Sequence, residues 1–354
     1  MLGLSAGVGL VGFGATGPAP HAWATFECGA SGLHARTGKE PRFLLQVDTA
    51  TSHFTQLEIV SASRRVIRRV ARVGPGGVPA AVAPNGKLVA WMGAKGLVVE
   101  RIDGPARRVV EGTGLYAGLY LPNPFVWSPD SKSVLTIDPS GGLTIVSLAT
   151  GAKQEVVRPL GQLPVEALAW PRLKTIVFDI VGTSSARVVL ANRSGSAQHT
   201  ILRQSIDQTY NVAATVSVSP NRECINLNAA FDSPGDPSTS QFKSVNVLTG
   251  HQTRARPFDA YDLGTIWSPD SSRVAANVAD GPSVIMSPSG TILDTIRHNS
   301  FSTVAWTESA IYLLYSGLSS KNANKLFEIP AGRTTTEVAF KLPRGQEILS
   351  VQPF

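Results

Sequence analysis

One stretch of the chain occurs twice in nearly the same form, and it constrains the fold more than any other feature. Residues 125–135 comprise an apolar strand, the motif Trp-Ser-Pro-Asp and a second apolar strand, and residues 265–275 repeat this pattern. With Trp127 as the marker, spacings of 45, 43, 48, 49 and 39 residues connect Val82, Trp127, Trp170, Val218, Trp267 and Trp306. Such periods indicate stacked units of about four short strands. The apolar runs are short, β-branched and interrupted by Gly, Pro, Asn and Asp, which favours strands and turns over helices.

The turn in this repeat has a local physical cause. Proline presets φ at the first corner, and the Asp or Asn that follows can hydrogen-bond to the backbone two residues further on. We therefore interpret Asp130 and Asp270 as turn-forming residues and not as catalytic carboxylates. The Trp or Val before the turn is expected to end an innermost strand, where a large ring packs between neighbouring repeats.

Trp-Ser-Pro-Asp followed by a small residue and an apolar strand resembles the TolB-like, WD40-like (PD40) β-propeller repeat. The glycine usual after the Asp is replaced by Ser131 and Ser271 and is kept only as Gly86. The repeats at Trp170 and Trp306 lack Ser-Pro-Asp and have shorter turns. The resemblance covers roughly residues 42–354 and implies a fold, not a function. TolB carries an additional N-terminal α/β domain, which we do not expect in this chain, so its role in an envelope complex does not transfer directly.

The phase of the repeats predicts how the ring closes. Residues 348–354 repeat the strand-into-Pro pattern, with Val351 lying 45 residues after Trp306, and supply only an innermost strand. Strands expected at 43–47, 54–60 and 65–73 lack such a partner. Completion of this first blade by the C-terminal strand removes two exposed sheet edges, which otherwise promote association. The prediction is an all-β fold, a single closed propeller of four-stranded blades, with seven blades favoured and six as the alternative.

The N-terminal region differs from the rest of the chain. Residues 1–24 resemble the back half of a secretory signal peptide, because residues 1–16 are small, apolar and uncharged and Ala-Trp-Ala precedes Thr25, although a positive start is missing. We expect a leader (1–24), an N-terminal extension (25–41) and the propeller (42–354). The protein is then exported, to the periplasm, cell surface or medium; a disordered N-terminus is the alternative. Beyond the leader, no apolar run approaches the roughly 18 residues of a membrane helix.

The two cysteines, Cys28 and Cys224, are too few for a disulfide scaffold. In an oxidising compartment they can pair and tie the extension to the fifth blade. The alternative is one buried and one idle thiol. Phe26 and Glu27 are not the small residues that a lipoprotein signal requires before its cysteine, so we expect no lipid anchor.

The net charge of +7 includes a cluster of arginines. These are Arg64, Arg65, Arg68, Arg69, Arg72, Arg101, Arg107 and Arg108. A wall polymer, a phospholipid or a nucleic acid would match the charge. The arginines are expected on outermost strands, however, where charge protects an edge from mispairing, and the aromatic interleaving needed for single-stranded nucleic acid is missing. We interpret them as a solvated edge and do not expect a nucleic-acid partner.

The candidate binding residues lie in the connections from the outer strand of one blade to the inner strand of the next. These connections gather on one face, and loops carry function on a rigid frame. Tyr recurs there with Asp, and Tyr supplies rigid area and a hydroxyl at interface hot spots. The alternative is that these rings plug the channel mouth or lean on neighbouring blades. The candidate partner-binding residues are Tyr116, Tyr120, Asp207, Tyr210, Asp259, Tyr261, Asp262 and His298.

Other features give no catalytic signature. Gly3-Leu4-Ser5-Ala6-Gly7 matches a nucleophile elbow but lies in the leader, without the preceding strand. The six histidines lack metal-ligand spacing, and we expect no cofactor and no catalytic residue of a known motif. Residues 232–240 and 316–324 are expected to be surface loops. The favoured function is a non-catalytic module that holds a protein or a cell-envelope component on its loop face. The alternative is a lactonase-like or lyase-like enzyme with an axial metal site. The oligomeric state is left open.

Overall fold

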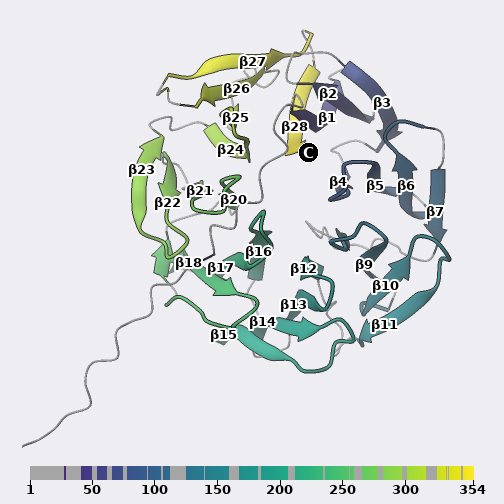
Figure 1. Cartoon of the computed structure of the whole chain (residues 1–354), viewed down its shortest axis with the longest axis vertical. Coiled ribbons are helices and arrows are strands. Elements are labelled where there is room, and N and C mark those ends of the chain that lie inside the picture. Colours follow the sequence, from purple (N-terminus) through teal and green to yellow (C-terminus); the bar gives the residue numbers. More distant parts are fainter. Residues whose placement is uncertain are drawn as a thin grey trace, which may run out of the picture.

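The computed structural model describes the seven repeats and two residues of the extension, 28 and 41. The described residues are 28, 41–49, 54–61, 66–74, 78–93, 95–104, 107–111, 125–138, 140–158, 167–181, 185–205, 212–233, 236–254, 256–258, 265–277, 282–296, 301–315, 325–331, 333, 335–343 and 346–354. They form a ring of sheets around a central axis (Figure 1). Among them, no helix is long and apolar enough to cross a membrane.

Seven antiparallel sheets of four strands form the blades, and within each blade the strands run in order from the innermost to the outermost. Blade 1 is β28 (Gln346–Pro353), β1 (Arg42–Thr49), β2 (Thr55–Ser61) and β3 (Val66–Val73). Blade 2 is β4 (Ala80–Val82), β5 (Leu88–Gly93), β6 (Gly96–Arg101) and β7 (Arg107–Glu111). Blade 3 is β8 (Phe125–Trp127), β9 (Ser133–Ile137), β10 (Leu143–Ser147) and β11 (Lys153–Val157). Blade 4 is β12 (Ala167–Arg172), β13 (Thr175–Val181), β14 (Ser185–Asn192) and β15 (His199–Ser205).

The remaining three blades follow in the same order. Blade 5 is β16 (Val212–Val218), β17 (Cys224–Ser233), β18 (Asp236–Asn246) and β19 (Arg256–Phe258). Blade 6 is β20 (Thr265–Trp267), β21 (Val274–Ala276), β22 (Ser283–Met286) and β23 (Ile292–Ile296). Blade 7 is β24 (Phe301–Trp306), β25 (Ala310–Tyr315), β26 (Lys325–Pro330) and β27 (Glu337–Lys341). The all-β propeller and its seven blades are therefore confirmed, and the six-bladed alternative is excluded.

The C-terminal strand closes the ring, as predicted. Strand β28 pairs antiparallel with β1, from Phe43 opposite Pro353 to Thr49 opposite Gln346. One irregularity, between Gln46 and Val47, interrupts the register. Because β28 follows blade 7 in the chain but pairs within blade 1, it links the last blade to the first and covers the inner edge of β1.

The apolar core lies between blades rather than inside any one of them. Successive clusters of buried side chains each draw on two adjacent blades. The cluster between blades 7 and 1, for example, contains Phe43, Tyr312 and Ile348, and the ring centroids of Phe43 and Tyr312 lie 4.8 Å apart. A single blade therefore cannot bury its own faces, which is the general rule for repeat architectures.

The tryptophans of the repeat join neighbouring blades. The indole Nε1 of Trp127 donates to the carbonyl of Ala81 in blade 2 at 3.2 Å, and that of Trp267 donates to Ser217 in blade 5 at 3.3 Å. Trp170 is also buried, but its Nε1 finds no acceptor among the described residues. The predicted packing of these innermost-strand tryptophans against a neighbouring blade is confirmed.

The arginine cluster departs in part from the predicted solvated edge. Strand β3 is the outermost strand of its sheet, as expected, but Arg101 ends the third strand of blade 2. Arg68 is mostly buried at the junction of blades 1 and 2. Its guanidinium pairs with Glu100 and donates to the carbonyls of Arg101, Ile102 and Gly104, the last two at 2.9 and 3.2 Å. Arg68 therefore connects two blades instead of shielding an edge. Arg64 and Arg65 lie outside the described residues, and of Arg107 and Arg108 only the backbone is described.

The prediction of a surface loop at residues 232–240 is wrong. Strands β17 and β18 extend into it, and the register continues through Phe231 opposite Thr239 to Ser233 opposite Asp236. Backbone pairing needs no apolar side chain, so the polar composition that predicted a loop is compatible with a long hairpin. The second expected loop, 316–324, lies outside the described residues.

We expect Arg68→Met to lower the free energy of unfolding by about 2–4 kcal/mol, because a buried carboxylate and several carbonyls lose their donor. Chemical and thermal unfolding would measure the change. Arg158→Met is the matched control, since Arg158 is 83% exposed and its pair with Glu155 is worth at most about 1 kcal/mol. Equal losses for the two variants would contradict a structural role for Arg68.

Candidate functional site

The ring has two unlike faces. Because the strands of each blade alternate in direction, the turns from first to second and from third to fourth strand lie on one face, which we call the turn face. The second-to-third links and the links to the next blade lie on the other, which we call the connection face. Carbonyls of the first turn accept N–H groups of the third-to-fourth turn of the same blade, as between Lys132 and Leu148 at 2.9 Å.

The predicted binding residues all belong to connection-face segments outside the described residues. Tyr116 and Tyr120 follow β7, Asp207 and Tyr210 follow β15, and Asp259, Tyr261 and Asp262 follow β19. His298 follows β23. Each segment links the outermost strand of one blade to the innermost strand of the next, as the phase of the repeat predicts. That these side chains bind a partner stays a prediction.

The turn face is built from a side-chain-capped turn that recurs around the ring. In blade 3, the Ser128 hydroxyl donates to the Asp130 carboxylate at 2.6 Å and accepts the backbone N–H of Ser133 at 2.9 Å. The same carboxylate accepts the N–H of Lys132 at 3.1 Å. Blades 5 and 6 repeat the arrangement with Ser219 and Asn221 and with Ser268 and Asp270. The prediction that Asp130 and Asp270 form turns is confirmed, since both carboxylates are used in this way.

The residue after the Asp or Asn has left-handed backbone in each capped turn. Its φ is 65° at Gly86, 61° at Ser131, 60° at Arg222 and 63° at Ser271. Left-handed backbone costs roughly 1–2 kcal/mol at a residue with a Cβ, which explains the usual glycine. The two serines gain a compensating contact, because Ser131 Oγ accepts the N–H of Asn85 at 3.0 Å and Ser271 Oγ accepts that of Asn221 at 3.2 Å. Both bonds join the turns of adjacent blades, so serine connects blades where glycine cannot.

Hydrogen bonding also sets the charge state of these turns. Burial alone would raise the pKa of Asp270, but donation from Ser268, from the Ser272 backbone and from the Ser272 hydroxyl outweighs it. The pKa of Asp270 therefore lies below its ordinary value of 3.8. Asp130 shows the same balance, with Ser128 and the Lys132 backbone as donors against burial, and its pKa is also lowered.

One position of the turn carries lysine in three consecutive blades. Lys87, Lys132 and Lys174 are equivalent, because the carbonyl of each accepts an N–H from the outer turn of its own blade at 2.9–3.0 Å. All three side chains are exposed. The equivalent residue is Glu223 in blade 5. The sequence prediction overlooked these lysines because it followed the arginines of the outer strands; alignment of the turn position across repeats would have found them.

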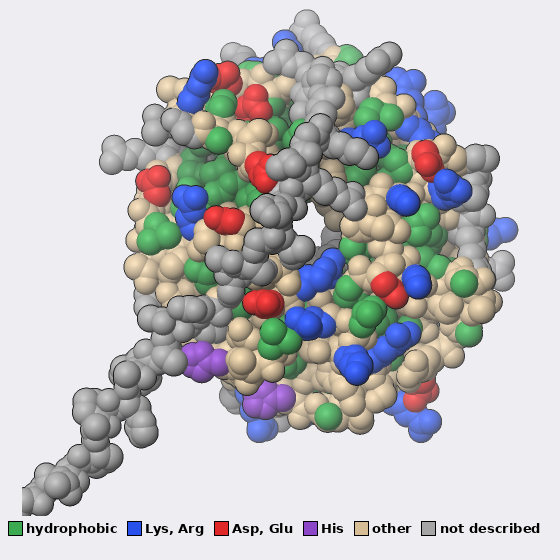
Figure 2. Space-filling view, in the orientation of Figure 1, with side chains coloured by type: hydrophobic (Ala, Val, Ile, Leu, Met, Phe, Trp, Pro, Cys, Tyr) green, Lys and Arg blue, Asp and Glu red, His purple; other side chains and the backbone are tan. Residues whose placement is uncertain are grey.

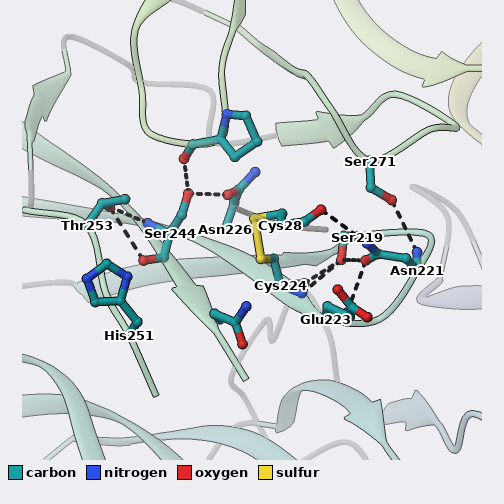
Figure 3. Close-up of a disulfide and its surroundings, with 12 residues drawn as sticks. Cys28, Ser219, Asn221, Glu223, Cys224, Asn226, Ser244, His251, Thr253 and Ser271 are labelled. Carbon is teal, nitrogen blue, oxygen red and sulfur yellow. Dashed lines mark hydrogen bonds between the residues drawn. A yellow bond between two sulfur atoms is a disulfide. The ribbon is translucent and has the colours of Figure 1, made fainter. Parts of the chain in front are cut away.

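A disulfide between Cys28 and Cys224 attaches the extension to the turn face (Figure 3). Of the two alternatives for the cysteines, pairing is the one observed. Cys28 is buried with Trp267 and Val274 of blade 6, and its carbonyl accepts the side-chain N–H of Asn221 at 3.2 Å. The disulfide therefore lies at the junction of blades 5 and 6, as the predicted link to the fifth blade requires.

The junction of blades 5 and 6 contains several polar contacts. The Ser244 hydroxyl lies within hydrogen-bond distance of the side-chain amide oxygen of Asn226, at 2.5 Å, and of the backbone carbonyl of Pro288 in blade 6. The hydroxyls of Ser217 and Thr265 lie 2.7 Å apart across the same junction. Two small apolar clusters lie at this junction: one holds Phe242, Ala276, Val284 and Met286, and in the other the two cysteines pack with Trp267 and Val274. The covalent link thus reinforces a junction whose apolar contact is small.

Within the part of the chain that the structure describes, no group of three or more His, Cys, Asp and Glu residues is arranged to hold a metal ion. The described Asp130 and Asp270 are occupied by turn hydrogen bonds. The described residues thus offer turn-forming and inter-blade chemistry.

Comparison with known proteins bears on the fold alone. No protein-family model matches the chain, and no curated protein matches it. Many solved structures do match. A prolyl endopeptidase structure is 14% identical with a TM-score of 0.54, over 87% of this chain and 50% of that chain. A functionally unknown protein from Desulfotomaculum acetoxidans is 11% identical with a TM-score of 0.52, over 89% of this chain and 99% of the other.

TolB from Acinetobacter baumannii is also among the similar structures, at 14% identity and a TM-score of 0.48, over 85% of this chain and 67% of TolB. The seven blades and the matches with TM-scores above 0.5 confirm a β-propeller fold, as the repeat predicts. Identities this low transfer no activity from any of these proteins.

The left-handed serines give a testable order of stability. Ser271→Ala loses the bond from Asn221 and keeps the strained backbone, so we expect a loss of about 1–3 kcal/mol. Ser271→Gly loses the same bond but relieves the strain, and is expected to be more stable than the alanine variant by about 1 kcal/mol. Unfolding midpoints of both variants, and of the same pair at Ser131, would measure this. An alanine variant as stable as the glycine variant would contradict the proposed backbone strain, and a glycine variant more stable than the wild type would contradict its compensation by the serine hydroxyl.

The lowered pKa values of the turn carboxylates predict a dependence on pH. A carboxyl whose pKa is lower in the folded than in the unfolded state stabilises the fold above its unfolded pKa, and this contribution is lost as pH falls through the folded pKa. We therefore expect the melting temperature of the wild type to fall steeply below the ordinary value of 3.8, and that of Asp270→Asn to fall less over the same range. The melting temperature of each protein, measured from neutral to strongly acidic pH, tests this. Parallel pH profiles would contradict it.

Proposed function

We propose that the protein is an exported, non-catalytic binding module that holds a protein or cell-envelope partner on its connection face. The observation that carries the proposal is the closed ring itself, in which seven blades fix the ends of the connection segments on one rigid frame. Binding loops on such a frame lose little entropy on association, because their ends are already ordered.

The distribution of tyrosine in the sequence supports the same face. Four of the six tyrosines lie in connection segments, at Tyr116, Tyr120, Tyr210 and Tyr261. Aspartates accompany the last two. Tyrosine combines apolar area with a hydrogen-bonding hydroxyl, and it is enriched where binding energy is concentrated.

The disulfide supports export as part of this proposal. Disulfides persist in oxidising compartments such as the periplasm or the cell exterior, and Cys28 lies four residues after the predicted cleavage at Ala24. Cleavage there would leave the new N-terminus close to its covalent attachment on the turn face, away from the connection face.

The triple variant Tyr116→Ala, Tyr210→Ala and Tyr261→Ala tests the binding face. We expect capture of a specific partner from envelope and secreted extracts to fall by roughly tenfold or more, since buried tyrosines dominate binding energy at such sites. Quantitative mass spectrometry of proteins retained on the immobilised wild type and variant would measure the loss.

The matched control removes three side chains from the opposite face, as Lys87→Ala, Lys132→Ala and Lys174→Ala. This control should capture the partner as the wild type does, and both variants should keep the wild-type circular dichroism and the disulfide. Undiminished capture by the tyrosine variant would refute the proposed face. Stoichiometric metal in the purified protein, with no specific partner, would favour the axial enzyme instead.

A further inference from the structure

The turn face is electrically asymmetric. In the orientation of Figure 2, Lys and Arg side chains outnumber Asp and Glu on one side of the central opening, and most Asp and Glu lie on the other side. The basic side corresponds to the lysine positions of blades 2, 3 and 4, namely Lys87, Lys132 and Lys174. Arg172 and Arg193 are exposed in the turns of blade 4 beside Lys174. We call these five residues the basic arc.

Few carboxylates neutralise the basic arc. Asp103 is paired with Arg101 at 3.2 Å, so this pair adds no net charge. Asp130 lies in the same turn as Lys132 and offsets one positive charge. The other carboxylates in the turns of this face that the structure describes, Glu223, Asp270 and Glu308, belong to blades 5, 6 and 7. A net positive surface thus remains over blades 2–4.

Two exposed leucines lie in turns of the same face. Leu173 stands between Arg172 and Lys174 and is 46% exposed, and Leu248 follows β18 and is 54% exposed. An apolar side chain at the tip of a turn, flanked by basic residues, matches the boundary between lipid headgroups and acyl chains, where basic groups meet phosphate and apolar groups enter the boundary. A soluble polyanion offers no apolar region in which the two leucine side chains could be buried.

The attachment of the N-terminal region places it at the same face. The disulfide fixes Cys28 beside the turn of blade 5, and 27 residues precede it, of which residues 1–16 are apolar and uncharged. Polypeptide before Cys28 therefore starts from the face that carries the basic arc. A membrane-inserted leader, before cleavage or without it, would hold that face toward the bilayer.

From these observations we propose that the turn face docks on an anionic lipid bilayer through the basic arc, with Leu173 and Leu248 entering the interface. The positive charges engage lipid phosphates, and attraction near such a surface adds up over several lysines and arginines. The connection face then points away from the membrane. This inference does not depend on the proposed binding function, because it concerns the opposite face.

The full-length protein tests the proposal in a vesicle sedimentation assay. Vesicles of phosphatidylglycerol and phosphatidylcholine are compared with vesicles of phosphatidylcholine alone, at low and high salt. The predicted leader contains no Lys or Arg, so the ratio of binding to the two vesicle types reports on the basic residues. We expect the wild type to prefer anionic vesicles by roughly tenfold or more at low salt, and to lose the preference at high salt.

Two charge-matched variants locate the binding surface. Lys87→Ala, Lys132→Ala and Lys174→Ala together should abolish the preference to within about twofold. Lys95→Ala, Arg203→Ala and Lys341→Ala together remove the same net charge from exposed positions away from the turn face, and should retain it. Wild-type preference in the turn-face variant, with an intact disulfide and unchanged circular dichroism, would overturn the proposal.

The leucines separate a bilayer from a soluble polyanion. Leu173→Ser with Leu248→Ser should weaken binding to anionic vesicles by about threefold or more, because less apolar area enters the interface. Binding of double-stranded DNA by the wild type as tight as its vesicle binding, together with no effect of the leucine variant, would assign the arc to polyanions and overturn the lipid assignment.

Discussion

The pairing of β28 with β1 is the interaction on which the rest of the structure depends. Each apolar cluster needs two blades, so an open row of seven blades would bury six junctions, whereas the closed ring buries seven. The seventh junction joins residues from both ends of the chain, as Phe43 and Ile348 show by sharing a cluster with Tyr312. Closure therefore makes the stability of every blade dependent on the presence of the last strand, and it fixes the geometry of both faces.

The parts of the fold that sequence predicted are those set by local chemistry. Proline, a following Asp or Asn and a tryptophan at the end of a short strand specify a turn and an inter-blade contact within a dozen residues, so they can be recognised without knowledge of the neighbours. The pairing of Cys28 with Cys224, the burial of Arg68 against Glu100 and the extension of β17 into a polar segment depend on what the ring places beside them. Those contacts leave no periodic pattern, and an arginine in an outer strand has the same sequence signature whether it meets solvent or another blade.

The candidate site was predictable to a similar extent. Strand phase alone puts Tyr116, Tyr210 and Tyr261 in segments that link one blade to the next, and the strand bounds agree with that phase. The charge of the turn face was not predicted by the same means, because Lys87 and Lys132 lie just outside the motif and the repeat of Lys174 lacks it; the hydrogen-bonded carbonyls show that the three positions are equivalent. A repeat that is recognised by its Trp, Pro and Asp residues gives no information about the turn positions that vary from blade to blade.

The two faces also differ in how much sequence change they can accept. In the capped turns, serine and aspartate oxygens accept backbone N–H groups of the same turn. The serines with left-handed backbone, Ser131 and Ser271, accept an N–H from the turn of the neighbouring blade. An insertion in these turns would therefore break hydrogen bonds within a blade and between blades. The connection segments carry no such repeated motif, and the one between β7 and β8 spans residues 112–124. Selection can therefore vary the connection face for recognition, whereas the turn face is free to change only in side chains that point outward. Lysine at one outward position in three successive turns is a change of that kind, because it alters the surface charge without touching a hydrogen bond of the frame.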